Sequence, residues 1–172
     1  FKKAEVEYQK IYGLSRLVSG QNHLHITFES YILATYFEAI LERANLRLTA
    51  MTYGRYALMR RGENQGGRAI QGLDLDVMDY ESGKPRDIRT LSGGEAFKAA
   101  LSLALGMADL ISESVGGIEL DTLFIDEGFG SLDEHSRGQA VRILKEMAGG
   151  DRMIGIISHV TELKQEIDSQ LV

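Results

Sequence analysis

Two short motifs in this chain consist of residue types that bind phosphate and a metal ion. The first is Leu91-Ser92-Gly93-Gly94-Glu95, and the second is the acidic pair Asp126 and Glu127 at the end of an apolar run. Backbone amides at the start of a helix bind phosphate, and a carboxylate pair can hold Mg²⁺ and orient a water molecule. The chain lacks the G-x-x-x-x-G-K-S/T loop that cradles nucleotide phosphates. The motifs therefore predict one half of an ATP site with Mg²⁺, completed by another polypeptide segment.

The Ser92-Gly93-Gly94-Glu95 stretch has two interpretations. Ser before a helix and Glu three residues later form a capping box, which would stabilise any helix. The two glycines favour a second interpretation, because Gly costs about 1 kcal/mol relative to Ala at a helical position and lets a ligand approach the backbone. Free amides, the helix dipole and the Ser hydroxyl would all favour a phosphate there.

Asp126 and Glu127 are expected to close a buried strand and to point to opposite faces. Two buried acids are costly without an opposite charge, which Mg²⁺ on a nucleotide would supply. An ordinary acidic turn is the alternative. His159 follows a later apolar run that ends at the same predicted sheet edge, so it is a candidate phosphate donor, although a lone His at a strand end is commonly structural.

Hydrophobic periodicity and turn residues predict the elements that would position these side chains. Helices are expected over 1–18, 29–51, 95–111 and 134–148, strands over 23–28, 56–60, 73–77, 122–125 and 153–157, and turns over 62–67 and 81–85. The final strand, helix and strand predict one crossover unit of a parallel sheet. Both of its strands are unbroken apolar runs, which indicates a sheet covered on both faces. Gly130–Asp133 is predicted as a tight turn whose Ser131, with Glu134, caps the following helix.

Composition is typical of a globular protein, with 44% hydrophobic and 26% charged residues. The absence of cysteine excludes disulfides and thiolate metal sites, and no apolar run is long enough to cross a membrane, so a cytoplasmic protein is expected. The net charge of −6 is uneven: residues 1–72 hold 10 Lys/Arg and 6 Asp/Glu, and residues 73–172 hold 9 and 19. A solvated helix face is favoured over a DNA-backbone contact for the arginines of the first part, which are Arg43, Arg47, Arg55, Arg60, Arg61 and Arg68.

Four motifs appear in the order typical of ABC-type ATPases: Leu91–Glu95, Thr122–Glu127, Gly130–Asp133 and Ser158-His159. They resemble the signature motif, the Walker B motif with its catalytic Glu, the D-loop and the H-loop. Within that superfamily, residues 117–133 and 31–34 resemble the SbcC branch, the coiled-coil ATPase of the bacterial SbcCD nuclease complex. The resemblance covers nearly the whole chain.

This resemblance implies an α/β fold: the C-terminal lobe of a split ABC-type ATPase head, in which helices flank a parallel sheet, with an antiparallel β ribbon and a helical coiled-coil stub. Residues 1–20 would be the end of the coiled-coil stem, and residues 21–172 would be the lobe, without the Walker A lobe. Because the chain does not begin with Met, it is expected to be a piece of a longer protein.

The resemblance also implies a role for each site residue. The stretch Ser92–Glu95 would bind ATP held by a second head, with the γ-phosphate against Ser92 and the two glycines, and Asp133 would lie at the seam between the heads. Asp126 would hold Mg²⁺ through water. Glu127 would orient or deprotonate the attacking water, and His159 would hydrogen-bond the γ-phosphate.

The expected partners are the N-terminal Walker A lobe, a second head, an SbcD-like metallonuclease and double-stranded DNA, without a membrane. ATP would be hydrolysed only beside the Walker A lobe, so the chain alone would be inactive. A RecN-like or SMC-like ATPase is an alternative. The nucleotide-binding component of an ABC transporter would carry Walker A in the same chain, and a non-catalytic scaffold would not need Asp126, Glu127 and His159.

Overall fold

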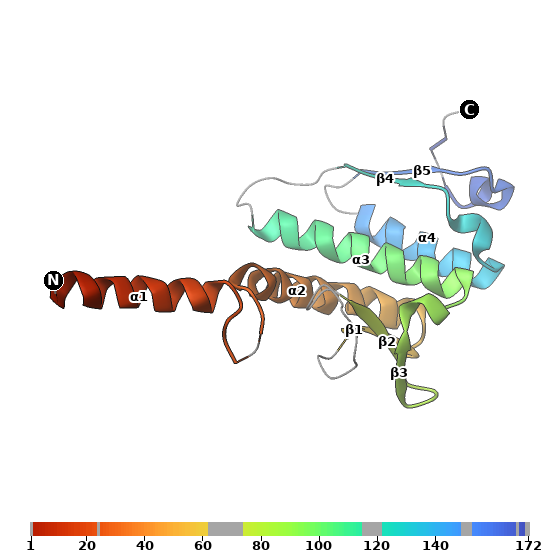
Figure 1. The fold of residues 1–172 in the computed structure, drawn as a ribbon. Helices are drawn as coiled ribbons and strands as arrows, with labels where there is room; N and C mark the ends of the chain where they lie inside the picture. The colour runs from red at the N-terminus through yellow and green to blue at the C-terminus, as the bar shows by residue number, and fades with distance from the viewer. Residues whose placement is uncertain are drawn as a thin grey trace. The chain divides into compact units, whose positions relative to one another are not determined.

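The computed structural model describes residues 2–23, 25–61, 74–114, 122–148, 153–167 and 169–170 (Figure 1). The chain divides into two compact units, Phe1–Ala39 with Arg60–Leu75 and Ile40–Met59 with Asp76–Val172. Among the described residues, no helix combines the length and apolar character needed to cross a membrane. The predicted turn at 62–67 lies outside the described residues.

The first unit contains helix α1 (Lys2–Val18) and the beginning of helix α2 (Phe28–Met51). Both helices confirm the periodicity, but the strand predicted over 23–28 is wrong. In its described part the chain turns and then begins α2, because the Asn22 side chain donates to the carbonyls of Leu17 and Ile26 at 3.0 and 2.7 Å. The Thr27 hydroxyl then accepts the Ser30 N–H at 3.1 Å, as expected of a helix N-cap.

Helix α1 has no buried residue, and its apolar side chains are exposed to solvent. These side chains are Val6, Tyr8, Ile11, Tyr12, Leu14, Leu17 and Val18. The rings of Tyr8 and Tyr12 stack with their centroids 5.9 Å apart.

The second unit is built around helices α3 (Gly93–Ser114) and α4 (Glu134–Ala148), which the sequence predicted. Their buried side chains form one core with the end of α2 and with the segments that follow the two parallel strands of this unit. Its members are Met51, Leu101, Leu105, Phe129, Leu132, Ala140, Val141, Leu144 and Leu163. At Gly106 a Cβ would lie only 2.8 Å from the Ile40 carbonyl oxygen and the Ala44 nitrogen. Glycine there lets α3 pack closely against α2.

Strands β4 (Thr122–Asp126) and β5 (Met153–Ile157) pair in parallel, with Thr122 opposite Met153 and Asp126 opposite Ile157. Helix α4 is the crossover between them, which confirms the predicted unit. Helices α3 and α4 lie on one side of the strand pair (Figure 1). The other face is open in this chain, with Phe124 68% and Met153 62% exposed, so the described residues provide only one of the two predicted covering layers.

A second sheet has the order β1 (Tyr56–Arg60), β2 (Leu75–Asp79) and β3 (Lys84–Asp87), and β2 pairs antiparallel with β3. This sheet is the predicted ribbon, although the turn before β3 ends at Gly83 and not at Pro85. Gly83 adopts a φ of 69°, and the Asp79 carboxylate accepts the Glu81 N–H at 3.0 Å. A short 3₁₀ turn, η1 (Ile88–Thr90), then leads into α3.

Candidate functional site

The signature turn, Ser92–Gly94, begins α3 with a reciprocal capping box. The Ser92 N–H donates to Glu95 Oε2 at 2.9 Å, and the Glu95 N–H donates to Ser92 Oγ at 3.4 Å. Gly93 is nevertheless exposed and Gly94 only partly buried, so the backbone of the turn is accessible to a ligand. The capping interpretation is confirmed. Capping is compatible with phosphate binding, because the backbone of the turn stays accessible.

The signature turn lies directly against the segment Gly130–Asp133. A Cβ on Gly93 would lie 3.6 Å from Ser131 Cβ, and one on Gly94 would lie 3.5 Å from Leu132 Cδ2. The two motifs, separated in sequence by the whole of α3 and β4, therefore form one continuous surface of the second unit.

Glu95, predicted to take part in nucleotide binding, has its carboxylate bound inside the chain. In addition to capping Ser92, it accepts a hydrogen bond from the Tyr56 hydroxyl at 2.7 Å. Burial raises the pKa of Glu95, but the hydrogen bonds from Ser92 and Tyr56 outweigh it, and the pKa lies below its usual value. The contact with Tyr56 could not be predicted from the sequence, because it joins residues 39 positions apart.

Asp126 is the last residue of β4, and Glu127 bends away from the strand with a φ of 60°. Its N–H donates to the Ile157 carbonyl at 2.8 Å, and Gly128 follows with a φ of 98°. A Cβ on Gly128 would lie 2.3 Å from the Phe97 ring, so glycine is required for two independent reasons. Left-handed backbone at a residue other than glycine is uncommon and concentrates at functional sites.

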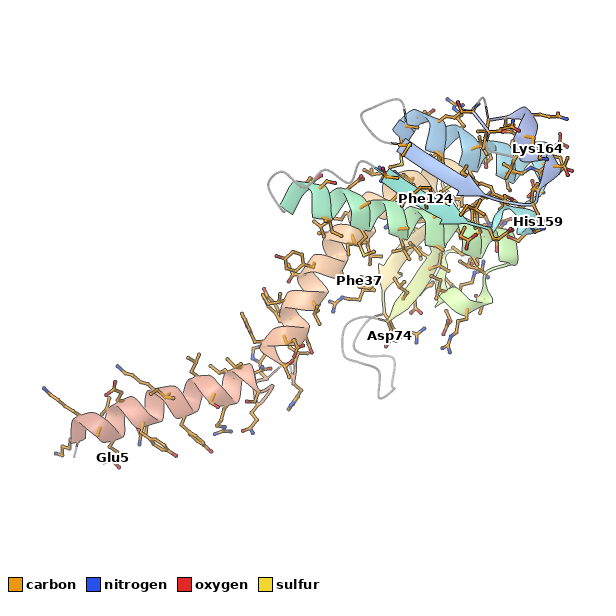
Figure 2. All side chains as sticks on the ribbon, turned by 90° about the horizontal axis from the view of Figure 1, so that it is seen from above. Glu5, Phe37, Asp74, Phe124, His159 and Lys164 are labelled. Atoms are coloured by element: carbon orange, nitrogen blue, oxygen red, sulfur yellow. The ribbon has the colours of Figure 1, made fainter. Side chains whose placement is uncertain are left out.

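The acidic pair is exposed, so the expectation of two buried carboxylates is wrong. His159 follows β5 (Figure 2). Its Nδ1 lies 3.0 Å from Glu127 Oε1. Because a carboxylate only accepts, Nδ1 carries the proton of this hydrogen bond, which leaves Nε2 for another partner. The structure thus brings Asp126, Glu127 and His159 to one edge of the sheet, as predicted.

Asp133 caps helix α4, with one carboxylate oxygen accepting the Ser136 N–H at 2.9 Å and the other accepting its hydroxyl at 2.7 Å. These two hydrogen bonds lower the pKa of Asp133. The predicted cap by Ser131 and Glu134 is wrong, because the Ser131 hydroxyl donates instead to the Gly128 carbonyl at 2.9 Å. The sequence pattern favours Ser131 over Asp133 as the cap, because Ser131 and Glu134 have the capping-box spacing.

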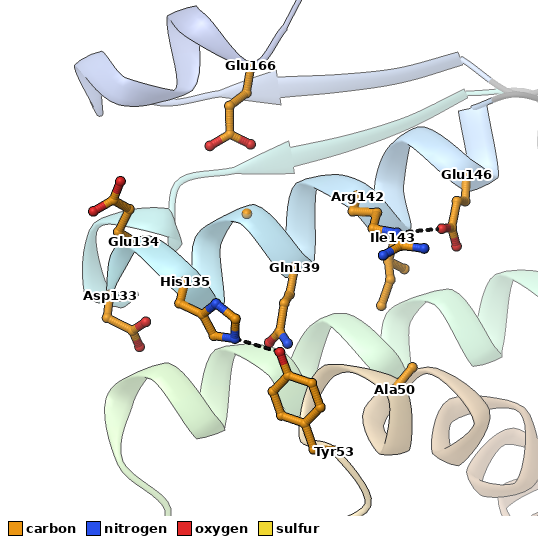
Figure 3. Close-up of a pocket in the computed structure, with 11 residues that line it drawn as sticks. Ala50, Tyr53, Asp133, Glu134, His135, Gln139, Arg142, Ile143, Glu146 and Glu166 are labelled. Carbon is orange, nitrogen blue, oxygen red and sulfur yellow. Dashed lines mark hydrogen bonds and ion pairs between the residues drawn. The ribbon is translucent and has the colours of Figure 1, made fainter.

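A groove of about 1000 Å³ runs along α4 beside Asp133 (Figure 3). Its wall includes Tyr53, whose hydroxyl lies 2.6 Å from His135 Nε2, and the two rings stack with centroids 5.8 Å apart. The ring of His135 is thus engaged by Tyr53. Within the described parts of the chain, no group of three or more His, Cys, Asp or Glu side chains is arranged to hold a metal ion.

Most of the arginines considered for DNA contact form ion pairs within their own unit. Arg47 lies 2.7 Å from Asp109, Arg60 lies 2.8 Å from Glu38, and Arg55 lies 2.9 Å from Glu81. Arg43 is paired with Glu113. Arg68 lies outside the described residues. Arg43 and Arg47 lie on helix α2, in line with the predicted charged helix face, whereas Arg55 precedes β1 and Arg60 ends it.

The family model and similar sequences both point to SbcC proteins. Residues 71–146 match the family described as SbcC/RAD50-like, Walker B motif. The SbcC component of the nuclease SbcCD from Vibrio cholerae is 49% identical over 167 residues, which are 97% of this chain and 16% of that protein. The protein of the same name from Staphylococcus haemolyticus is 46% identical over 161 residues, 94% of this chain and 16% of that protein. The chain thus spans about a sixth of the length of these relatives.

Solved structures show the same fold at low sequence identity. The Smc head domain from Pyrococcus furiosus, bound to the C-terminal domain of ScpA, aligns with a TM-score of 0.63 at 16% identity, covering 97% of this chain and 38% of that one. A structure of an SMC ATPase, from work on ATP-driven dimerization, aligns with a TM-score of 0.61 at 16% identity, covering 81% and 78%. The fold is that of an SMC-type ATPase head, and the sequence places the chain in the SbcC/RAD50-like family, of which it carries the Walker B region.

Proposed function

We propose that this chain is the C-terminal lobe of an SbcC-type ATPase head, which binds and hydrolyses ATP together with a Walker A lobe and a second head. The hydrogen bond between Glu127 and His159 at an exposed sheet edge is the observation that supports this function most strongly. Residues 1–20 are the end of a coiled-coil stem, and residues 21–172 form the lobe. The chain alone is inactive, because it holds only half of the site.

The residues at the sheet edge fit ATP with Mg²⁺. Asp126 offers one exposed carboxylate, and Mg²⁺ in nucleotide sites keeps several waters and needs only one or two protein carboxylates. When bound, the ion would neutralise charge that develops on the phosphate oxygens. Glu127 orients or deprotonates the attacking water. His159 positions Glu127 through Nδ1, and it donates from Nε2 to the γ-phosphate when the ring carries a proton on both nitrogens.

The signature turn binds ATP held by a second head. Ser92, Gly93 and Gly94 supply a hydroxyl and backbone amides at the positive end of the α3 dipole. Their contact with Ser131 supports a common role for the two motifs, with Asp133 at the seam between the heads. ATP would then join the two heads.

The open face of the β4–β5 sheet supports the presence of a Walker A lobe. Phe124, Met153 and Ile157 form an apolar patch there, and large side chains in such a patch indicate a surface that another element covers. The name of the relatives, which are SbcC components of the nuclease SbcCD, supports an SbcD-like metallonuclease and double-stranded DNA as further partners. The ATP state of the heads would gate the access of DNA ends to that nuclease.

The test is ATP hydrolysis by a reconstituted head, which is this lobe mixed with its Walker A lobe. Glu127→Gln should lower kcat by about 100-fold or more, because general-base catalysis contributes about 10²–10⁴. Glu162→Gln, an exposed glutamate of the 3₁₀ turn η3 (Thr161–Gln165), is the matched control and should retain the wild-type rate. Equal turnover by wild type and Glu127→Gln would contradict the assignment.

A further inference from the structure

One arginine of the ribbon, Arg86 on β3, reaches both sides of the signature turn. Before the turn, its Nη1 donates to the Thr90 carbonyl at 3.0 Å and to the Thr90 hydroxyl at 3.1 Å. Toward the other side, its Nη2 donates to the Tyr56 hydroxyl at 3.0 Å and lies 3.9 Å from Glu95 Oε2. A guanidinium group is suited to this, because its donors form a planar fork.

Tyr56 extends this contact to the far side of the turn. Its hydroxyl accepts from Arg86 and donates to Glu95 Oε1 at 2.7 Å, and Glu95 in turn accepts the Ser92 N–H. Burial and the hydrogen bond to Glu95 raise the pKa of Tyr56, so the hydroxyl keeps the proton that it donates. Arg86, Tyr56 and Glu95 therefore form a continuous chain of hydrogen bonds, called here the Arg86 clamp.

The ribbon holds the clamp firmly in place. The Tyr56 ring lies under two guanidinium groups, with Arg55 Cζ 4.9 Å and Arg86 Cζ 5.3 Å from its centroid. Asp79, whose side chain is only 8% exposed, lies 3.5 Å from Arg86 Nε and 3.7 Å from Arg55 Nε. A buried carboxylate requires nearby positive charge, so Asp79 keeps both arginines beside the ring.

We propose that Arg86 and Tyr56 are positioning residues, which fix the signature turn in the arrangement that receives the phosphate of ATP on the second head. This inference rests on the proposed function. Arg86 binds Thr90 before the turn, Tyr56 binds Glu95 after it, and Gly93 stays accessible. Loss of the clamp should thus loosen the turn and weaken the contact between heads, while the binding of nucleotide to the Walker A lobe remains.

The test compares Tyr56→Phe with Tyr80→Phe and Arg86→Gln with Arg89→Gln in the reconstituted head. Tyr80, in the turn between β2 and β3, and Arg89, in η1, are both exposed. The measurements are ATP-dependent association of heads, ADP affinity and the thermal midpoint of unfolding. Tyr56→Phe keeps the ring that contacts the two guanidinium groups and removes only the hydroxyl.

Tyr56→Phe and Arg86→Gln should raise the ATP concentration needed for half-maximal association roughly tenfold, as expected for the loss of one hydrogen bond to a charged group. ADP affinity should stay within about twofold, and the two controls should behave as wild type. Association by Tyr56→Phe equal to wild type would overturn the inference. A parallel loss of ADP affinity and thermal midpoint would also overturn it, because it would show a structural role alone. If wild-type heads fail to associate with ATP, the proposed function itself is wrong.

Discussion

The signature turn and the carboxylate edge of the β4–β5 sheet differ in how the chain supports them. The signature turn is held by the ribbon through Arg86, Tyr56 and Glu95, and its own capping box closes it. The edge carries two exposed acids, and the backbone bends at Glu127 in a left-handed conformation. His159 contacts Glu127, but its own side chain is 80% exposed. We infer that the phosphate-binding turn is arranged in advance within this chain, whereas the hydrolytic edge becomes enclosed only when other elements cover it.

The largest effect is expected from Gly128→Ala, which should distort the backbone bend at Glu127 and Gly128. The new Cβ would overlap the Phe97 ring, and the φ of 98° is unfavourable for alanine. Overpacking of this kind costs about 1–3 kcal/mol of stability, and the displaced Glu127 should abolish most ATP hydrolysis. Urea unfolding and turnover of the reconstituted head measure the two effects.

Gly138→Ala is the control for this substitution, because a Cβ at Gly138 in α4 would meet nothing within 4 Å. It should leave hydrolysis unchanged and stabilise the head by about 0.5–1 kcal/mol, the usual advantage of Ala over Gly within a helix. If Gly128→Ala were as stable and as active as Gly138→Ala, the bend would not determine the position of Glu127.

A smaller, pH-dependent effect is expected at Asp133, the residue that caps α4. The pKa of Asp133 in the folded protein is lowered by Ser136, so its contribution to stability is present above the ordinary Asp pKa. That contribution is lost as the pH falls through the lowered value. Asp133→Ala should therefore melt below wild type at neutral pH, and the two melting curves should converge in acid.

Thermal melts of both proteins from neutral to strongly acidic pH check this expectation, with Ser131→Ala as a control outside the cap of α4. A difference between wild type and Asp133→Ala that stayed constant down to the lowest pH would show that the carboxylate charge is not what caps the helix.

Sequence patterns predicted the regular elements better than the connections between them. Helix α4 and strand β5 lie where periodicity placed them, since both have strong apolar patterns with clear ends. The segment after α1 is not the predicted strand, because the hydrogen bonds of Asn22 to Leu17 and Ile26 determine its course and leave no periodic signal in the sequence.

The candidate site was predictable to the extent that its residues occur in motifs. The meeting of Glu127 and His159 followed from two parallel strands that end at one edge. The left-handed backbone of Glu127 and the contact of Tyr56 with Glu95 could not be predicted, because both depend on packing between segments distant in sequence.

The central claim is that the signature turn of one head completes the hydrolytic edge of another. Mixing two inactive heads, Ser92→Arg and Glu127→Gln, tests it most directly, because only a mixed pair contains one site with both residues intact. With random pairing of symmetric heads, the mixture should recover roughly a quarter of the wild-type ATP hydrolysis rate. A mixture no more active than the sum of the two variants would contradict the claim.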